Sequence, residues 1–158
     1  MTHYLQHHTL FPPLIGNKPS LNLGIIVVIP CYDEPFLLLS LMSLKRCRLP
    51  VCDVEVLVVV NDSETDPDAV KRRNEETFAQ AEVWASKNSH PRLKFHVLYQ
   101  RDLPAKHAGV GLARKIGMDE ACWRFRKIKN PNGIIVGFDA DSKCDPDYFE
   151  AIWAHFSR

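Results

Sequence analysis

Short apolar runs alternate along the chain with longer segments that have the length and composition of helices. The apolar runs are rich in β-branched residues, as buried strands are, and they cover residues 24–30, 54–60, 93–99 and 133–138. Helical segments are expected at residues 34–47, 66–88 and 108–127, and a last helix begins within residues 141–158. This alternation predicts an α/β domain in which helices flank a mainly parallel sheet.

Local signals refine this outline. The polar segment 61–66 is expected to be the exit loop of the second strand, and Asp66 with Pro67 is expected to be the cap and first residue of the next helix. Residues 1–22 contain prolines and no strong periodic pattern, so they predict a loosely ordered leader before a domain at residues 23–158. A chain of 158 residues is long enough for one domain with a substantial core.

The charge balance limits the classes of partner. Twenty basic and nineteen acidic residues give a net charge of +1, which does not favour binding to nucleic acid or to an anionic membrane. Four basic residues lie near the end of the third predicted helix, where positive charge offsets the helix dipole, and their side chains are expected to be solvated: Arg124, Arg126, Lys127 and Lys129.

The expected location is the cytoplasm, either free or peripheral to the inner face of a membrane. No apolar run approaches the length of a membrane span, and the first twenty residues do not have the pattern of a signal peptide. The five cysteines are odd in number and form no C-x-x-C pair, which indicates reduced thiols and not a disulfide framework or a zinc knuckle.

Acidic residues follow three of the predicted strands. Asp33 and Glu34 follow the first, Asp62 follows the second, and Asp139 and Asp141 follow the fourth. Ligands of such sheets bind beyond the carboxyl ends of the strands, and clustered carboxylates there are costly unless a cation or hydrogen-bond donors compensate them. Carboxylate oxygens suit Mg²⁺ or Mn²⁺, and Mg²⁺ commonly completes its shell with phosphate oxygens, so the pattern indicates a diphosphate substrate. Alternatively, these aspartates are ordinary turn and cap residues.

A glycine-containing segment opens the third predicted helix. Gly109, Gly111 and Gly117 leave room for a ligand or for close packing, and Arg114 and Lys115 could face phosphate oxygens. Close packing of the helix on the sheet, with both cations solvated, explains the segment equally well.

Four segments together resemble, in order and spacing, the nucleotide-sugar-binding half of glycosyltransferase family 2, which has the Rossmann-like GT-A fold. They are VVIPCYDEP, VVVNDSETD, AGVGLARKIGMDEA and VGFDADSKCDPDYF, and the resemblance covers nearly the whole chain from Leu23 onward. It implies transfer of a sugar, with inversion, from a UDP- or GDP-type donor to a glycan, lipid or protein acceptor, assisted by Mg²⁺ or Mn²⁺.

The resemblance also assigns roles by position. Tyr32 would lie against the base, Asp33 and Glu34 near the nucleoside, and Asp62 at the base edge. Asp139 would lie by the ribose and metal, and Asp141 would ligate the metal.

The chain departs from the family pattern in two ways. Asn61 replaces the first of two paired acids, and Lys115 replaces an asparagine that commonly follows Ala-Arg. The family's acceptor half and its catalytic base follow the segment that resembles this chain, so the resemblance implies a truncated GT-A domain without an assignable base. A non-catalytic nucleotide-sugar-binding or interaction module remains an alternative. A nucleotidyltransferase is less favoured, because the segment YDEP, with the acidic Asp33 and Glu34, stands where that class carries a glycine-rich basic loop.

Overall fold

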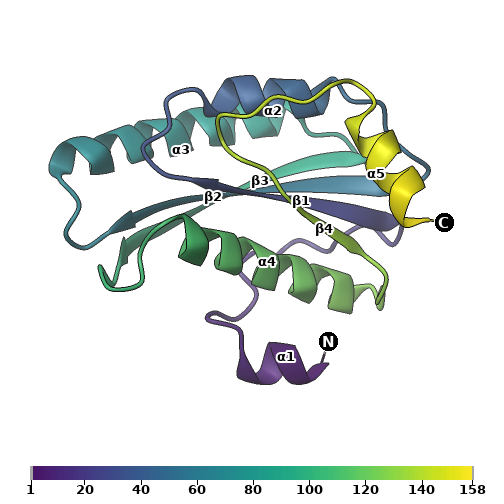
Figure 1. Cartoon of the computed structure of the whole chain (residues 1–158), viewed down its shortest axis with the longest axis horizontal. Coiled ribbons are helices and arrows are strands. Elements are labelled where there is room, and N and C mark those ends of the chain that lie inside the picture. The colour runs from purple at the N-terminus through teal and green to yellow at the C-terminus, as the bar shows by residue number, and fades with distance from the viewer. Residues whose placement is uncertain (1, 158) are drawn as a thin grey trace.

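A computed structural model describes residues 2–157, and its centre is one four-stranded sheet (Figure 1). Every neighbouring pair of strands is parallel, and the order across the sheet is β3-β2-β1-β4. The strands are β1 (Leu23–Cys31), β2 (Asp53–Ser63), β3 (Leu93–Leu103) and β4 (Ile134–Gly137). The predicted α/β architecture is therefore confirmed.

Helices cover both faces of the sheet (Figure 1). Helices α2 (Leu37–Lys45) and α3 (Asp68–Asn88) lie on one face, and α5 (Tyr148–Phe156) contributes the buried Phe149 to the same side. Helix α4 (Val110–Lys127) covers the other face, and α1 (Thr2–His7) packs outside α4. No helix within residues 2–157 is both long enough and apolar enough to cross a membrane.

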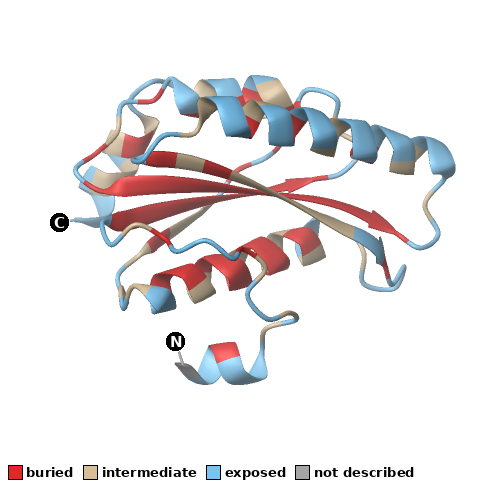
Figure 2. Ribbon diagram, turned by 180° about the vertical axis from the view of Figure 1, so that it is seen from behind, coloured by how far each residue is buried: buried red, intermediate tan, exposed pale blue. Residues whose placement is uncertain are grey.

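The two central strands are buried throughout their length, which explains their continuous apolar sequences (Figure 2). Val27 and Val56 are register partners, and both are fully buried. On the α4 face the sheet approaches the helix closely, since a Cβ at Gly117 would lie 2.4 Å from Cγ1 of Val28. Gly117 therefore serves close packing, while a Cβ at Gly109 or Gly111 would meet no atom within 4 Å.

Two predictions at the end of β2 are wrong. Residues 61–63 belong to the strand and not to an exit loop, because Asn61 pairs with Gln100 and Ser63 pairs with Leu103. Asp66 does not cap α3, which has Pro67 at its N-cap. Its Oδ2 instead accepts a hydrogen bond from the backbone N–H of Ser63 at 2.7 Å.

The leader is ordered against α4, so the prediction of a loosely ordered segment is also wrong. Leu5 is buried, and the Tyr4 hydroxyl donates to Oδ1 of Asp119 at 2.7 Å. Further along, the backbone N–H of Leu14 donates to Oε2 of Glu120 at 2.7 Å. These acceptors lie more than a hundred residues away in the sequence, so local patterns could not predict the contacts.

One member of the basic cluster on α4 is not solvated, contrary to the prediction. Arg124 is fully buried and donates through Nη2 to Oε1 of Glu55 at 2.7 Å, while its Nε contacts the other oxygen. Burial opposes ionisation of Glu55, but His96 and Arg124 more than offset it and lower the pKa of Glu55 to about 2. This ion pair joins the C-terminal end of α4 to the start of β2.

Candidate functional site

A cavity of about 230 Å³ opens at the carboxyl ends of β1 and β2. Its walls come from the residue after β1, the end of β2 and the loop that leads into α4, and its lining consists of Tyr32, Asn61, Ser63, Asp66, Ala105, Ala108 and Gly109. A larger cavity of about 850 Å³ lies along β3 and is lined by none of the residues predicted to bind the donor, whereas Tyr32 lines the smaller one. The smaller cavity is therefore the better candidate site, because it occupies the place where parallel sheets bind ligands.

Asn61 supplies an unused acceptor at this cavity. The residue is 1% exposed, and its Nδ2 donates to the carbonyl oxygen of Cys31 at 3.0 Å. Its Oδ1 is buried and has no hydrogen-bond partner within the part of the chain that the structure describes. Because an unsatisfied buried acceptor costs about 1–3 kcal/mol, an N–H or O–H donor at this oxygen, from a water or from a ligand, would be favourable.

Tyr32 lies at the edge of the same cavity. Its side chain is partly exposed, and its hydroxyl donates to Oδ1 of Asp66 at 2.9 Å. Burial and the hydrogen bond to Asp66 raise the pKa of Tyr32, so the phenol stays protonated at neutral pH. The exposed ring is available for stacking on a planar ligand.

Asp33 is held by hydrogen bonds to α3, and Glu34 is held by a hydrogen bond within its own loop. Asp33 has a left-handed φ of 49°, and its backbone N–H donates to Oδ1 of the buried Asn74 at 2.9 Å. Arg73 donates to both carboxylate oxygens of Asp33, at 2.5 and 2.9 Å, and lowers its pKa. The Oε1 of Glu34 accepts from the backbone N–H of Phe36 at 2.8 Å. The structure therefore gives both side chains a part in shaping the loop that ends in α2.

Asp62 lies beside Asn61 but does not line the cavity. Its Oδ2 accepts from the Tyr99 hydroxyl at 2.7 Å, and its Oδ1 accepts from the backbone N–H of Asp102 at 2.6 Å. The side chain is buried, and both of its oxygens join β2 to β3. Burial and the contact with Asp62 raise the pKa of Tyr99, which keeps that phenol protonated.

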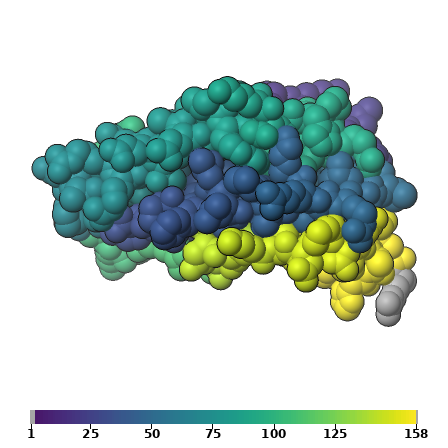
Figure 3. Space-filling model, turned by 90° about the horizontal axis from the view of Figure 1, so that it is seen from above, coloured from purple at the N-terminus to yellow at the C-terminus, as the bar shows by residue number. Residues whose placement is uncertain are grey.

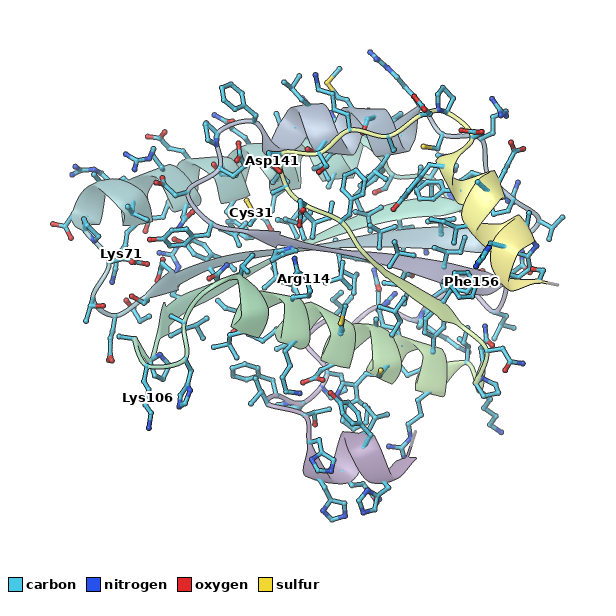
Figure 4. The ribbon with its side chains drawn as sticks, in the orientation of Figure 1. Cys31, Lys71, Lys106, Arg114, Asp141 and Phe156 are labelled. Carbon is cyan, nitrogen blue, oxygen red and sulfur yellow. The ribbon has the colours of Figure 1, made fainter. Side chains whose placement is uncertain are left out.

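The Asp139 and Asp141 pair lies in the segment that leaves β4. Arg114, in the second turn of α4, donates through Nη2 to Oδ1 of Asp139 at 3.2 Å. Asp141 is exposed, and no side chain or N–H within residues 2–157 donates to its carboxylate. The carbonyl between them, at Ala140, accepts from Oγ of Ser40 at 2.6 Å. In Figure 4, Asp141 is labelled near α2, above the strands, and Arg114 is labelled near α4, below them.

The donor set of this pair suits a hard divalent cation. Mg²⁺ commonly takes one or two protein carboxylates and completes its shell with water and substrate phosphates. Asp139 and Asp141 can supply those two carboxylates, while residues 2–157 contain no cluster of three or more His, Cys, Asp or Glu side chains able to hold a metal. Two carboxylates would leave most of a cation's shell to water or to a ligand, and within residues 2–157 they do not form a complete protein cage.

Lys115 lies apart from the other predicted site residues. Its Nζ contacts the hydroxyl of Tyr4 at 3.0 Å, the carbonyl oxygen of His8 at 2.8 Å and both oxygens of Asp119. These groups belong to the leader and to the outer side of α4. The structure brings Arg114 and Asp139 together, but it does not bring Lys115 to them.

Sequence reasoning missed the roles of two residues at the site. Asn61 was noted only as a departure from a family pattern, although a polar residue that ends a run of buried valines indicates a special position. Asn74 gave no signal in the predicted helix. It is fully buried on α3, accepts from Asp33 and donates through Nδ2 to the carbonyl oxygen of Asn61 at 3.0 Å.

Comparison with solved structures identifies the fold. The chain is similar to the crystal structure of S. aureus TarS 1-349, with a TM-score of 0.53 and 20% identity over 85% of this chain. A second S. aureus TarS structure gives a TM-score of 0.50 and 18% identity, also over 85% of this chain. The chain spans 32% and 20% of these two proteins, respectively. No family model matches the sequence, and a search of curated proteins finds no match. The α/β fold thus resembles the GT-A domain of TarS.

Proposed function

We propose that this chain is the donor-binding domain of a glycosyltransferase, which binds a UDP- or GDP-type sugar together with Mg²⁺ or Mn²⁺. The observation that carries the proposal is that Asn61 lines a cavity at the carboxyl end of the sheet and has a buried Oδ1 without a hydrogen-bond partner among residues 2–157. The resemblance of the fold to the GT-A domain of TarS supports the same conclusion.

The chemistry of Asn61 favours particular bases. Its Oδ1 can only accept, and uracil and guanine carry a ring N–H on the Watson–Crick edge where cytosine and adenine carry an acceptor. The ring of Tyr32, at the edge of the same cavity, would stack on that base. In this assignment Asn61 contacts the base edge, and Asp62 holds the strand ends in place.

The diphosphate would lie toward the start of α4 and the Asp139 and Asp141 pair. Gly109 lines the cavity and is the N-cap of α4, whose first N–H groups and dipole favour an anion. The pair between Arg114 and Asp139 is solvent-exposed and therefore weak, so the guanidinium can turn toward a phosphate at little cost.

Asp139 and Asp141 are the residues that would hold the cation. The bound ion would act as a Lewis acid that stabilises the departing diphosphate when a sugar is transferred with inversion. No described residue is assigned as the base for an acceptor hydroxyl, and the acceptor class, whether glycan, lipid or protein, stays open. The proposal therefore concerns donor binding.

The proposal is tested by comparing the affinities of one protein for nucleotides with different bases. In calorimetric titrations with Mn²⁺ present, we expect the wild-type chain to bind UDP or GDP at least about tenfold more tightly than CDP or ADP, the effect of one good hydrogen bond. The Asn61→Leu variant should lose this preference and retain weak binding of all four. A preference that persists in Asn61→Leu, or equal binding of all four by the wild type, would overturn the assignment of Asn61.

A further inference from the structure

Two cysteine sulfurs lie close together where α2 meets the segment between β4 and α5. Sγ of Cys47, two residues after α2, is 3.5 Å from Sγ of Cys144, although the residues are 97 positions apart in the sequence. Cys47 is 7% exposed and Cys144 is half-buried. A disulfide is about 2.05 Å long, so a side-chain movement of about 1.5 Å would join the two sulfurs.

The backbone around this pair is already held in place. The segment that follows β4 lies along α2 (Figure 3), where the backbone N–H of Cys144 donates to Oγ of Ser43 at 3.3 Å. At the end of α2, the backbone N–H of Arg48 donates to the carbonyl oxygen of Pro146 at 2.8 Å. The same segment carries Asp139 and Asp141, so a covalent bond here would fasten their loop to α2.

Access to the pair is unequal. Cys144 lines an open cavity of about 340 Å³, together with Phe138, Tyr148 and Ala151. Cys47 lies behind it, and its thiol contacts the carbonyl oxygens of Ser43 and Asp145. Burial, together with the contact to Cys144, raises the pKa of Cys47. An oxidant that enters from solvent therefore meets Cys144 first.

We propose that Cys47 and Cys144 form a redox-modification site, in which exchange with a small disulfide such as oxidised glutathione produces a reversible intramolecular disulfide. The Cys144 thiolate attacks one glutathione sulfur, which forms a mixed disulfide and releases one reduced glutathione. The Cys47 thiol then loses its proton and attacks the Cys144 sulfur, which releases the second glutathione. Two protein thiols are oxidised, and one oxidised glutathione is reduced to two thiols.

The other three cysteines provide an internal comparison. Cys31 and Cys52 are buried, Cys122 is half-buried, and the described part of the chain brings no second sulfur into contact with any of them. The proposal concerns the thiols themselves and does not depend on nucleotide binding, so either proposal can fail without the other.

The test equilibrates the wild-type chain with oxidised and reduced glutathione at several ratios, followed by acid quench, alkylation, digestion and mass spectrometry. We expect one cross-linked product, Cys47 to Cys144, which disappears when reduced glutathione is added. Cys31, Cys52 and Cys122 should remain available for alkylation after unfolding. The oxidised chain should also unfold at a higher temperature than the reduced chain, because the bond closes a long loop.

Two variants separate the two steps. Cys47→Ser should stop at glutathione bound to Cys144, and Cys144→Ser should leave Cys47 reduced, while Cys122→Ser serves as the control and should behave as the wild type. Circular dichroism verifies the fold of each variant, and the wild-type result decides the question if a variant unfolds. Wild-type chain in which both cysteines remain alkylatable, or in which Cys144 keeps glutathione without the cross-link, would overturn the proposal.

Discussion

Replacing Asp62 with alanine tests whether this residue is structural and Asn61 is the residue that faces the ligand. The Asp62 carboxylate is 2% exposed and accepts from the Tyr99 hydroxyl at 2.7 Å and from the Asp102 N–H at 2.6 Å. Hydrogen bonds to a charged group contribute about 1.5–3 kcal/mol each, so the two bonds together contribute about 3–6 kcal/mol. Part of this is offset because the variant no longer buries a charge. We therefore expect Asp62→Ala to lower the free energy of unfolding by about 3 kcal/mol.

The assay is urea denaturation followed by circular dichroism, with the Asp139→Ala variant as a matched control. The side chain of Asp139 is 66% exposed and forms one ion pair, so its removal should cost less than about 1 kcal/mol. For nucleotide binding the expected order is reversed, with Asp62→Ala retaining the affinity of the wild type and Asp139→Ala losing it. A stability loss below about 1 kcal/mol in Asp62→Ala, or loss of nucleotide binding from a folded Asp62→Ala chain, would refute this reasoning.

Three further predictions concern the packing of α4 on the sheet. Arg124→Met leaves the Glu55 carboxylate buried without its main partner, so urea denaturation should show a free energy of unfolding lower by about 3–5 kcal/mol. A double variant that also carries Glu55→Leu should recover most of this loss. A double variant as unstable as Arg124→Met alone would contradict the argument. The pKa of Glu55 falls from 4.5 to about 2 on folding, so its contribution of about 3 kcal/mol is complete above about pH 4.5 and is lost as the pH falls toward 2. The check is to measure the free energy of unfolding of the wild type and of Glu55→Gln between pH 2 and pH 4.5. Parallel pH profiles for the two proteins would argue against this contribution of Glu55. Gly117→Ala should lower the free energy of unfolding by about 1–3 kcal/mol, because the new Cβ would lie 2.4 Å from Cγ1 of Val28. Gly111→Ala has open space and should not lower it. Equal thermal midpoints for the two variants would contradict the packing argument.

The sequence predicted the sheet because its strands are buried on both faces and therefore appear as continuous apolar runs. It could not predict that β2 continues to Ser63, because the polar residues at its end are stabilised by pairing with β3 and not by local preference. Arg124 was assigned to the surface for a similar reason, since its partner Glu55 lies 69 positions away. Local patterns also could not show that the leader docks on α4.

At the candidate site, the sequence identified the strand ends but not the role of each side chain. Asn61 and Asp62 are neighbours on a strand, so their side chains point to opposite sides, and only the fold determines which of them reaches the cavity. The resemblance placed the base contact at Asp62. The structure shows both oxygens of Asp62 engaged with β3, while the free acceptor belongs to Asn61. The metal-binding role of Asp139 and Asp141 remains a prediction.

The most direct test of donor binding is calorimetric titration of UDP and GDP into the wild-type chain and into Asp141→Asn, each with and without Mn²⁺. The control is Asp145→Asn, which changes another exposed aspartate of the same segment. Our account predicts binding of at least one nucleotide that strengthens with Mn²⁺ in the wild type and the control, and that loses its dependence on Mn²⁺ in Asp141→Asn. Absence of nucleotide binding by folded wild-type chain, or equal dependence on Mn²⁺ in Asp141→Asn, would contradict it.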